Sequence, residues 1–226
     1  MNVNLKFYIG YALVYGLILL VGEGSYRFLR VKPEWSRNFS HLAAGMISLP
    51  YPWIFTSHWW VLLLAVQSSV VLFLTRNLNL LPSHHLSGSN SAGSYLFFAS
   101  LYICFLASSI LNNAFFFVLP MLVLSIGDVM AAIIGREFGK KDREFFNRIS
   151  KEDKTREGSI AFFLSTALVV SLAYFYYLQV SFYYALLMAL VISVTTAFTE
   201  AVSTKGYDNF FIPLITLFIM YLEASI

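Results

Sequence analysis

One stretch decides both the fold and the place to look for a site: Ile126-Gly-Asp-Val-Met-Ala-Ala-Ile-Ile-Gly-Arg-Glu-Phe-Gly-Lys. An apolar run carries Asp128 into what is typical of a membrane helix, and a highly charged loop follows. A carboxylate at that depth costs roughly 2.5 to 3.5 kcal/mol on insertion scales, so it usually faces a bundle interior or a water-filled cavity. Small residues share its helical face, which predicts close approach by another helix or by a ligand: Gly127, Ala131, Ala132 and Gly135.

The composition indicates an all-α polytopic membrane protein. Of the 226 residues, 58% are hydrophobic and only 12% are charged, whereas about 25% charged residues is usual for a soluble domain. Apolar runs of about 20 residues recur from end to end, the length that crosses a bilayer as a helix. We therefore expect one membrane domain over residues 1–226. The single cysteine, Cys104, excludes disulfides and cysteine-rich metal sites within one chain.

About eight transmembrane helices are predicted. Their ranges are Leu5–Val21, Phe39–Phe55, Trp59–Leu74, Ser94–Leu111, Ala114–Ile134, Ser159–Leu178, Phe182–Val202 and Phe210–Ile226. Pro50 and Pro52 predict a break or kink in the second. The first run lacks a small-residue cleavage site, so we expect a retained helix. The segment 81–93 is polar and rich in Ser, Gly and Asn, which predicts a flexible loop.

The basic residues predict the orientation. All Lys and Arg residues except Lys6 fall in the first, third, fifth and seventh loops. By the positive-inside rule these charged loops face the cytosol, and both termini lie on the opposite side of a cytoplasmic or endoplasmic-reticulum type membrane. Charged residues from five distant segments are then expected to meet on the cytosolic side: Arg37 with His41, Asp128, Lys154, Glu200 and Asp208.

Three acids on that side form an oxygen-rich set without thiolates. Asp128, Glu200 and Asp208 suit Mg²⁺ better than zinc, and Mg²⁺ normally completes its shell with waters and substrate phosphates. Glu200 lies on a stripe with Thr196 and Ser203, which favours a site, although hydroxyls alone also join helices. For Asp208 the alternative is an N-cap of the last helix.

The segment 154–159 predicts an anion-binding helix start. Thr155 is a candidate N-cap, so backbone N–H groups and the helix dipole favour phosphate near Gly158 and Ser159, with added charge from Lys154 and Arg156. Further phosphate-binding candidates are Gly135, Arg136, Arg37 and His41. Contact with anionic lipid heads is the alternative, and we favour it for Lys140, Lys141, Arg143 and Arg148. For His41 the alternative is a packed or interfacial residue.

Several motifs together resemble the dolichol kinase and phytol kinase family, which is distantly related to phosphatidate cytidylyltransferases. They are Gly127-Asp128, Gly135-Arg136, Gly139-Lys140, Lys154-x-x-Glu157-Gly158-Ser159, Thr199-Glu200 and Gly206-x-Asp208-Asn209-x-x-x-Pro213. Arg37-Asn38-x-x-His41 resembles the family's Arg-Lys-x-x-His, with Asn38 in place of the lysine. The His-Gly-Gly signature of bacterial phosphatidate cytidylyltransferases is absent from the sequence.

The resemblance implies a kinase that uses CTP to phosphorylate a polyprenol, dolichol or phytol type of lipid alcohol in the bilayer. It implies Mg²⁺ on Asp128 and Asp208, with Glu200 as a third ligand, and charge neutralisation by Lys154 and Arg156. Asp128 or Glu200 would accept the alcohol proton. No nucleic-acid partner is expected, and the sequence leaves the oligomeric state open, a homo-oligomer included.

Two other functions remain open at this point. A cytidylyltransferase of the phosphatidate type would use the same site and make a CDP-lipid. A small transporter would use Asp128 and Glu200 as an acid relay, but the acids lie on one side and no inverted repeat is evident.

Overall fold

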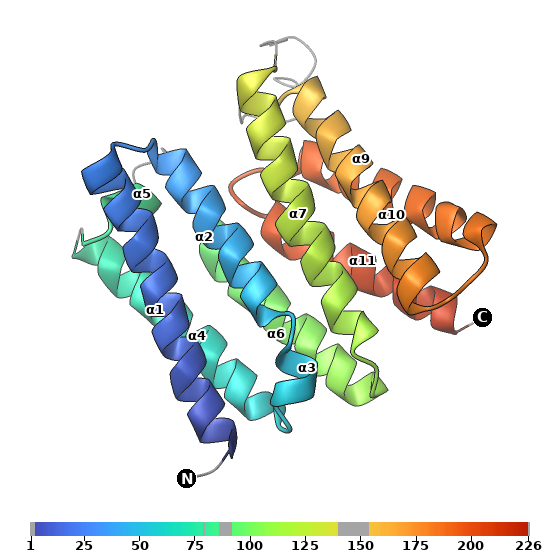
Figure 1. Ribbon diagram of the computed structural model, residues 1–226, viewed down its shortest axis with the longest axis horizontal. Coiled ribbons are helices and arrows are strands. Elements are labelled where there is room, and N and C mark those ends of the chain that lie inside the picture. Colours follow the sequence, from blue (N-terminus) through green and yellow to red (C-terminus); the bar gives the residue numbers. More distant parts are fainter. Residues whose placement is uncertain (1–2, 79, 86–91, 140–153, 226) are drawn as a thin grey trace.

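Helices form nearly all of the chain that the computed structural model describes, residues 3–78, 80–85, 92–139 and 154–225 (Figure 1). They are α1 (Val3–Leu29), α2 (Pro33–Ser48), α3 (Tyr51–Ile54), α4 (His58–Asn77), α5 (Pro82–His85), α6 (Gly93–Leu111), α7 (Phe115–Glu137), α9 (Arg156–Leu172), the π-helical turn η1 (Ala173–Tyr177), α10 (Phe182–Val202) and α11 (Asp208–Ala224). No strand occurs among these residues. The predicted all-α class is confirmed.

Six of the helices are long and apolar enough to cross a membrane: α1, α4, α6, α7, α9 with η1, and α10. The predicted second and eighth spans correspond to α2, with 16 residues, and α11, with 17 residues. The predicted break at Pro50 is confirmed, because α2 ends at Ser48 and the one-turn α3 follows. The count of eight spans stays a prediction, and so do the cytosolic orientation and the side on which the termini lie.

Helix α2 has a sequence that is amphipathic rather than uniformly apolar. Its buried face carries polar side chains, among them Ser36, Asn38 and Ser40. A lipid-exposed helix would not place hydroxyl and amide groups where no water reaches them. The inward polar face therefore indicates that α2 borders a site inside the protein.

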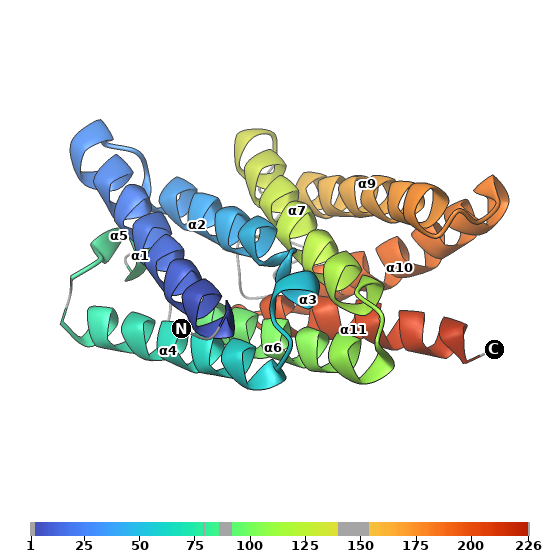
Figure 2. The ribbon, with the colours of Figure 1, turned by 60° about the horizontal axis from the view of Figure 1, so that its bottom comes forward.

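Helix α7 lies at the centre, between α2 on one side and α9 on the other (Figure 1). It packs against α9, α11, α2 and α6, while α4 and α1 pack further out and α10 covers α9 (Figure 2). Its first half is almost wholly buried, with Phe117, Leu119, Met121 and Leu124 inaccessible to solvent. The buried, apolar first half of α7 therefore positions its second half, which carries Asp128.

A short segment near the C-terminal end of α1 corrects the loop prediction for residues 82–85, while residues 86–91 of the predicted loop lie outside the described residues. Residues 82–85 form α5, which packs against α1 and α2. Glu23, only 5% exposed, accepts hydrogen bonds at Oε2 from the Ser83 hydroxyl (2.7 Å) and the Ser83 backbone N–H (3.1 Å). Arg27 pairs with the other Glu23 oxygen and donates to the backbone oxygen of Leu80 at 2.9 Å. This buried acid, which the sequence reasoning did not select, anchors α5.

Replacing Glu23 with alanine is expected to destabilise the protein by roughly 1–3 kcal/mol, because the buried Ser83 donors lose their acceptor. The thermal unfolding midpoint in detergent should fall. Ser25→Ala is the matched control on the same helix, since its hydroxyl bonds only the local backbone oxygen of Val21. Equal midpoints for the two variants would contradict the role of Glu23.

Candidate active site

The small-residue face of α7 is a helix-packing face. A Cβ added at Gly127 would stand 2.8 Å from the Phe162 ring of α9, and one added at Gly158 would stand 2.9 Å from the Ala131 backbone oxygen. Gly135 faces Thr155 and Gly158 in the same way. Of the two alternatives left open by the sequence, close approach by another helix is therefore confirmed. It fixes the start of α9 beside the charged end of α7.

The start of α9 has the predicted N-cap. The Thr155 hydroxyl accepts a hydrogen bond from the Gly158 backbone N–H at 3.1 Å, and α9 begins at Arg156. Both Thr155 and Gly158 line the large cavity described below. The positive end of the helix dipole therefore contributes to that cavity, a favourable place for an anion.

Lys154 joins two acids that are distant in sequence. Its Nζ lies 2.6 Å from Glu200 Oε1 and 3.0 Å from Asp208 Oδ2. Burial by itself lowers the pKa of the Lys154 ammonium, but Asp208 and Glu200 raise it by more, so the pKa lies above its ordinary value. The other Glu200 oxygen accepts a hydrogen bond from the Ser159 hydroxyl at 3.1 Å. Lys154 is therefore held between two carboxylates that favour its charged form.

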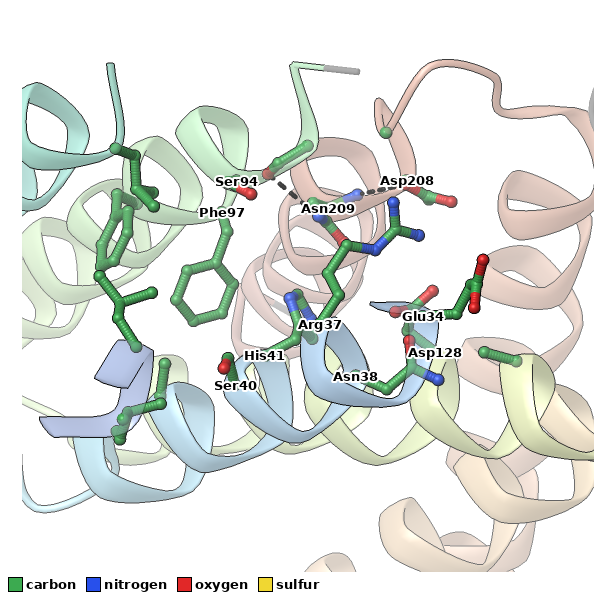
Figure 3. A pocket seen from close by; sticks show the side chains of 18 of the residues that line it. Glu34, Arg37, Asn38, Ser40, His41, Ser94, Phe97, Asp128, Asp208 and Asn209 are labelled. Carbon is green, nitrogen blue, oxygen red and sulfur yellow. Dashed lines mark hydrogen bonds between the residues drawn. The ribbon is translucent and has the colours of Figure 1, made fainter. Parts of the chain in front are cut away.

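A second network holds Asp208 in place. The Asn209 backbone N–H donates to Asp208 Oδ1 at 3.0 Å, and the Asn209 side-chain amide donates to the Gly93 backbone oxygen at 3.0 Å (Figure 3). The Ser100 hydroxyl donates to the Asn209 backbone oxygen at 2.8 Å. Asn209 thus fixes the start of α11 against α6, which explains the Asp-Asn pair in the sequence.

These groups border one cavity of about 960 Å³. Figure 3 shows Arg37 and His41 of α2, Asp128 of α7, and Asp208 and Asn209 of α11 around it. Its charged end is lined by Lys32, Glu34, Arg37, Asn38, His41, Asp128, Arg136, Lys154, Glu200, Asp208 and Asn209. Its other end is mostly apolar and is lined by Ala12, Tyr15, Gly16, Ile18, Leu19, Ala44, Val71, Leu72, Phe97 and Phe98. One continuous space therefore has two chemically different ends.

The structure brings together most of the site residues predicted from the sequence. The cavity is lined by Asp128, Glu200, Asp208, Lys154, Gly158, Gly135, Arg136, Arg37 and His41. Arg156 and Ser159 are not among its lining residues, and Ser159 instead contacts Glu200. Phosphate-binding roles for these two stay predictions. The lipid-head contacts predicted for Lys140, Lys141, Arg143 and Arg148 lie outside the described residues.

Two contributions of α2 were not predicted. The side-chain amide nitrogen of Asn38 and the hydroxyl of Ser40 are buried, line the cavity and have no hydrogen-bond partner in the described part of the chain. The guanidinium of Arg136 lies over the ring of Trp35, with 5.6 Å between Arg136 Cζ and the ring centroid. Asn38 and Ser40 are two positions apart and do not share one helical face, so no stripe in the sequence of α2 identified them.

The acids offer a partial metal site. In the residues that the structure describes, no three His, Cys, Asp or Glu side chains are close enough to hold a metal by themselves. All three acids line the cavity, where Glu200 binds Lys154 and Ser159 and Asp208 binds Lys154 and the Asn209 backbone N–H. Glu200 and Asp208 are thus engaged at both oxygens, and we propose Asp128 and Asp208 as the pair that would share a metal with substrate. Two carboxylates fit Mg²⁺ only when phosphate oxygens and waters complete its shell.

Comparison with known proteins defines the family. The family model described as "Cytidylyltransferase family" matches residues 4–202, which is most of the chain. The chain belongs to the cytidylyltransferase family. Within the same comparisons it is 26% identical over 207 residues to a protein named phytol kinase from Synechocystis, covering 91% of this chain and 87% of that protein. No solved structure matches the chain at a significant level.

A second relative of this family member is a protein named dolichol kinase sec59 from Schizosaccharomyces pombe. The two are 41% identical over 96 residues, 42% of this chain but only 17% of the yeast protein. The resemblance to the dolichol and phytol kinases that the motifs indicate is confirmed by these matches.

Proposed function

We propose that the protein is a CTP-dependent kinase that phosphorylates a membrane lipid alcohol with Mg²⁺. The observation that carries this proposal is the single cavity that joins a charged end to an apolar end. The phosphates of a nucleoside triphosphate are bound favourably by cations and by the N-terminus of a helix. In this cavity Lys154, Arg37 and the N-terminus of α9 are the groups of that kind. A lipid alcohol needs an apolar wall that reaches those groups. The kinase names of the two relatives support the same reaction class.

In the proposed reaction the alcohol oxygen attacks the terminal phosphorus of CTP. A bond forms between that oxygen and phosphorus, the bond to the bridging oxygen breaks, and CDP leaves. The alcohol proton passes to Asp128, because Glu200 already binds Lys154 and Ser159 at its two oxygens. Asp128 and Asp208 would hold Mg²⁺, which neutralises phosphate charge when bound.

The cations have separate tasks. Lys154 stays charged because of its two acids and stabilises the charge that develops on the transferred group, the main requirement of phosphoryl transfer. Arg37, which also lines the cavity, offers a guanidinium to the remaining phosphates. Glu200 orients Lys154 rather than contacting substrate.

Label transfer tests the proposal and separates it from its alternative. Purified protein in liposomes with a lipid-alcohol panel and Mg²⁺ should move radioactivity from γ-labelled CTP into lipid, and none from α-labelled CTP. Label from α-labelled CTP on a lipid phosphate acceptor would instead mean CDP-lipid synthesis, the reaction in the family's name. Chelation of divalent cations should stop transfer. Nucleotide-independent solute uptake without lipid labelling would support a transporter and overturn both.

A further inference from the structure

We infer that the hydrocarbon chain of the acceptor lies between α1, α4 and α6, and that Gly16 sets the width available to it. This inference rests on the proposed function, because it concerns the lipid half of the same cavity. It also identifies the helices between which the acceptor is held and a residue that controls which alcohols are accepted.

Two helical stripes form the walls of the apolar end. On α1 the lining residues recur one turn apart, as Ala12, Gly16 and Leu19 do. On α4 they are Gln67, Ser68, Val71 and Leu72, again one face of a helix. Helices α1 and α4 pack against each other and overlap in Figure 1, and in Figure 2 they diverge from the N-terminal end of α1. More than one turn of each helix therefore lines the cavity, which suits an extended hydrocarbon chain.

The chemistry of these walls favours a hydrocarbon over a nucleoside. A base and a ribose carry several donors and acceptors, which need hydrogen-bonding partners when they are buried. Among the lining residues of α1 and α4 such groups are few, and the Gln67 side-chain oxygen already accepts the hydroxyl of Tyr8. Phe97 and Phe98 of α6 add aromatic surface. The nucleoside is thus left to the charged end.

The boundary between the two ends is marked by His41. Its Nε2 is buried and has no hydrogen-bond partner within the described residues, while its ring packs edge-on against Phe97 at 4.8 Å between centroids. The neighbouring Ser40 hydroxyl is also buried without such a partner. An acceptor lipid with its polar head beside His41 could hydrogen-bond to these buried polar atoms. Its hydrocarbon chain would then pack against Phe97. We therefore place the acceptor's polar head on the His41 side of the boundary, facing the charged end that Asp128 also lines.

Gly16 is the position where a side chain would enter this space. No atom lies within 4 Å of a Cβ added there, although Gly16 lines the cavity. By contrast, neighbouring atoms leave no space for a Cβ at Gly127, Gly135 or Gly158. The side chain of a leucine at position 16 would thus fill part of the space proposed for the acceptor's hydrocarbon chain, without displacing a helix. Gly10, also on α1, is equally open but does not line the cavity, and so provides a matched control.

The test compares Gly16→Leu, Gly16→Ala and Gly10→Leu in liposomes with geraniol and with a long-chain polyprenol. We expect Gly16→Leu to lower kcat/KM for the polyprenol about tenfold or more relative to geraniol, equivalent to about 1.4 kcal/mol. For Gly16→Ala this ratio of kcat/KM values should lie between those of wild type and Gly16→Leu. Gly10→Leu should have the wild-type ratio, and the KM for CTP should be the same in all variants. Retained turnover of geraniol shows that a variant is folded.

Photo-crosslinking of a diazirine-bearing polyprenol to the wild-type protein gives a readout independent of turnover. We expect adducts on the peptides of α1 and α4, with fewer in Gly16→Leu. Adducts elsewhere only, or unchanged chain-length selectivity in Gly16→Leu, would overturn the inference while leaving the kinase proposal intact. A wild-type protein that phosphorylates no lipid alcohol would overturn the proposed function, and the adducts would still decide where a prenol chain binds.

Discussion

Replacing Asp128 with asparagine is expected to lower kcat by about a thousandfold or more, because the change removes the proton acceptor and one of two carboxylates proposed for Mg²⁺. The side chains have nearly the same shape, so the helix packing around Gly127 and Ala131 should persist. Turnover of γ-labelled CTP with a lipid alcohol measures the loss, and the thermal midpoint measures the fold.

Glu137→Gln is the matched control for that change. Glu137 ends the same helix but does not line the cavity, so its neutralisation should leave turnover close to wild type. Wild-type activity in Asp128→Asn would contradict its place at the reaction centre. Equal losses in the two variants would instead mean that only the summed charge of α7 matters.

Replacing Lys154 with methionine should abolish turnover and also destabilise the fold. The ammonium lies between Glu200 and Asp208, and removal of one member of a buried ion pair costs about 3–5 kcal/mol because the remaining charge is uncompensated. The side chain of Lys154 is 14% exposed, so we expect the lower end of that range. Thermal unfolding and label transfer, measured on the same preparation, separate the two effects.

A double variant isolates the role of the charge in catalysis. Lys154→Met with Glu200→Gln removes one charge of each sign, so the thermal midpoint should recover towards wild type while turnover stays absent. Lys205→Met is the control, since Lys205 lies in the loop before Asp208 but does not line the cavity. Activity restored by the double variant would assign Lys154 a purely structural role.

The sequence alone predicted those helices that have a long apolar run and a clear signal, such as proline, at their ends. The span predicted at Phe182–Val202 has the same bounds in the structure, and the break at Pro50 lies where proline denies a helix its hydrogen bond. Asp128, Glu200 and Lys154 could be selected because each brings charge into or beside an apolar run. Their meeting at one cavity followed from the positive-inside rule.

Other features depend on contacts that no local pattern shows. The pairing of Lys154 with Glu200 spans 46 residues, and the sequence predicted a phosphate and a metal as their partners instead. The bond between Glu23 and Ser83 spans 60 residues, and only tertiary packing makes 82–85 helical. Asn38 and Ser40 became candidates only when the inward face of α2 was known.

We propose that these acids and cations together bind a metal–triphosphate, and a binding measurement that needs no turnover tests this. Electron paramagnetic resonance of Mn²⁺, used in place of Mg²⁺, should show protein-bound metal only when CTP is present. We expect that signal to be lost in Asp128→Asn and kept in Glu137→Gln. Equal Mn²⁺ and CTP binding in wild type, Asp128→Asn and Lys154→Met would contradict the claim.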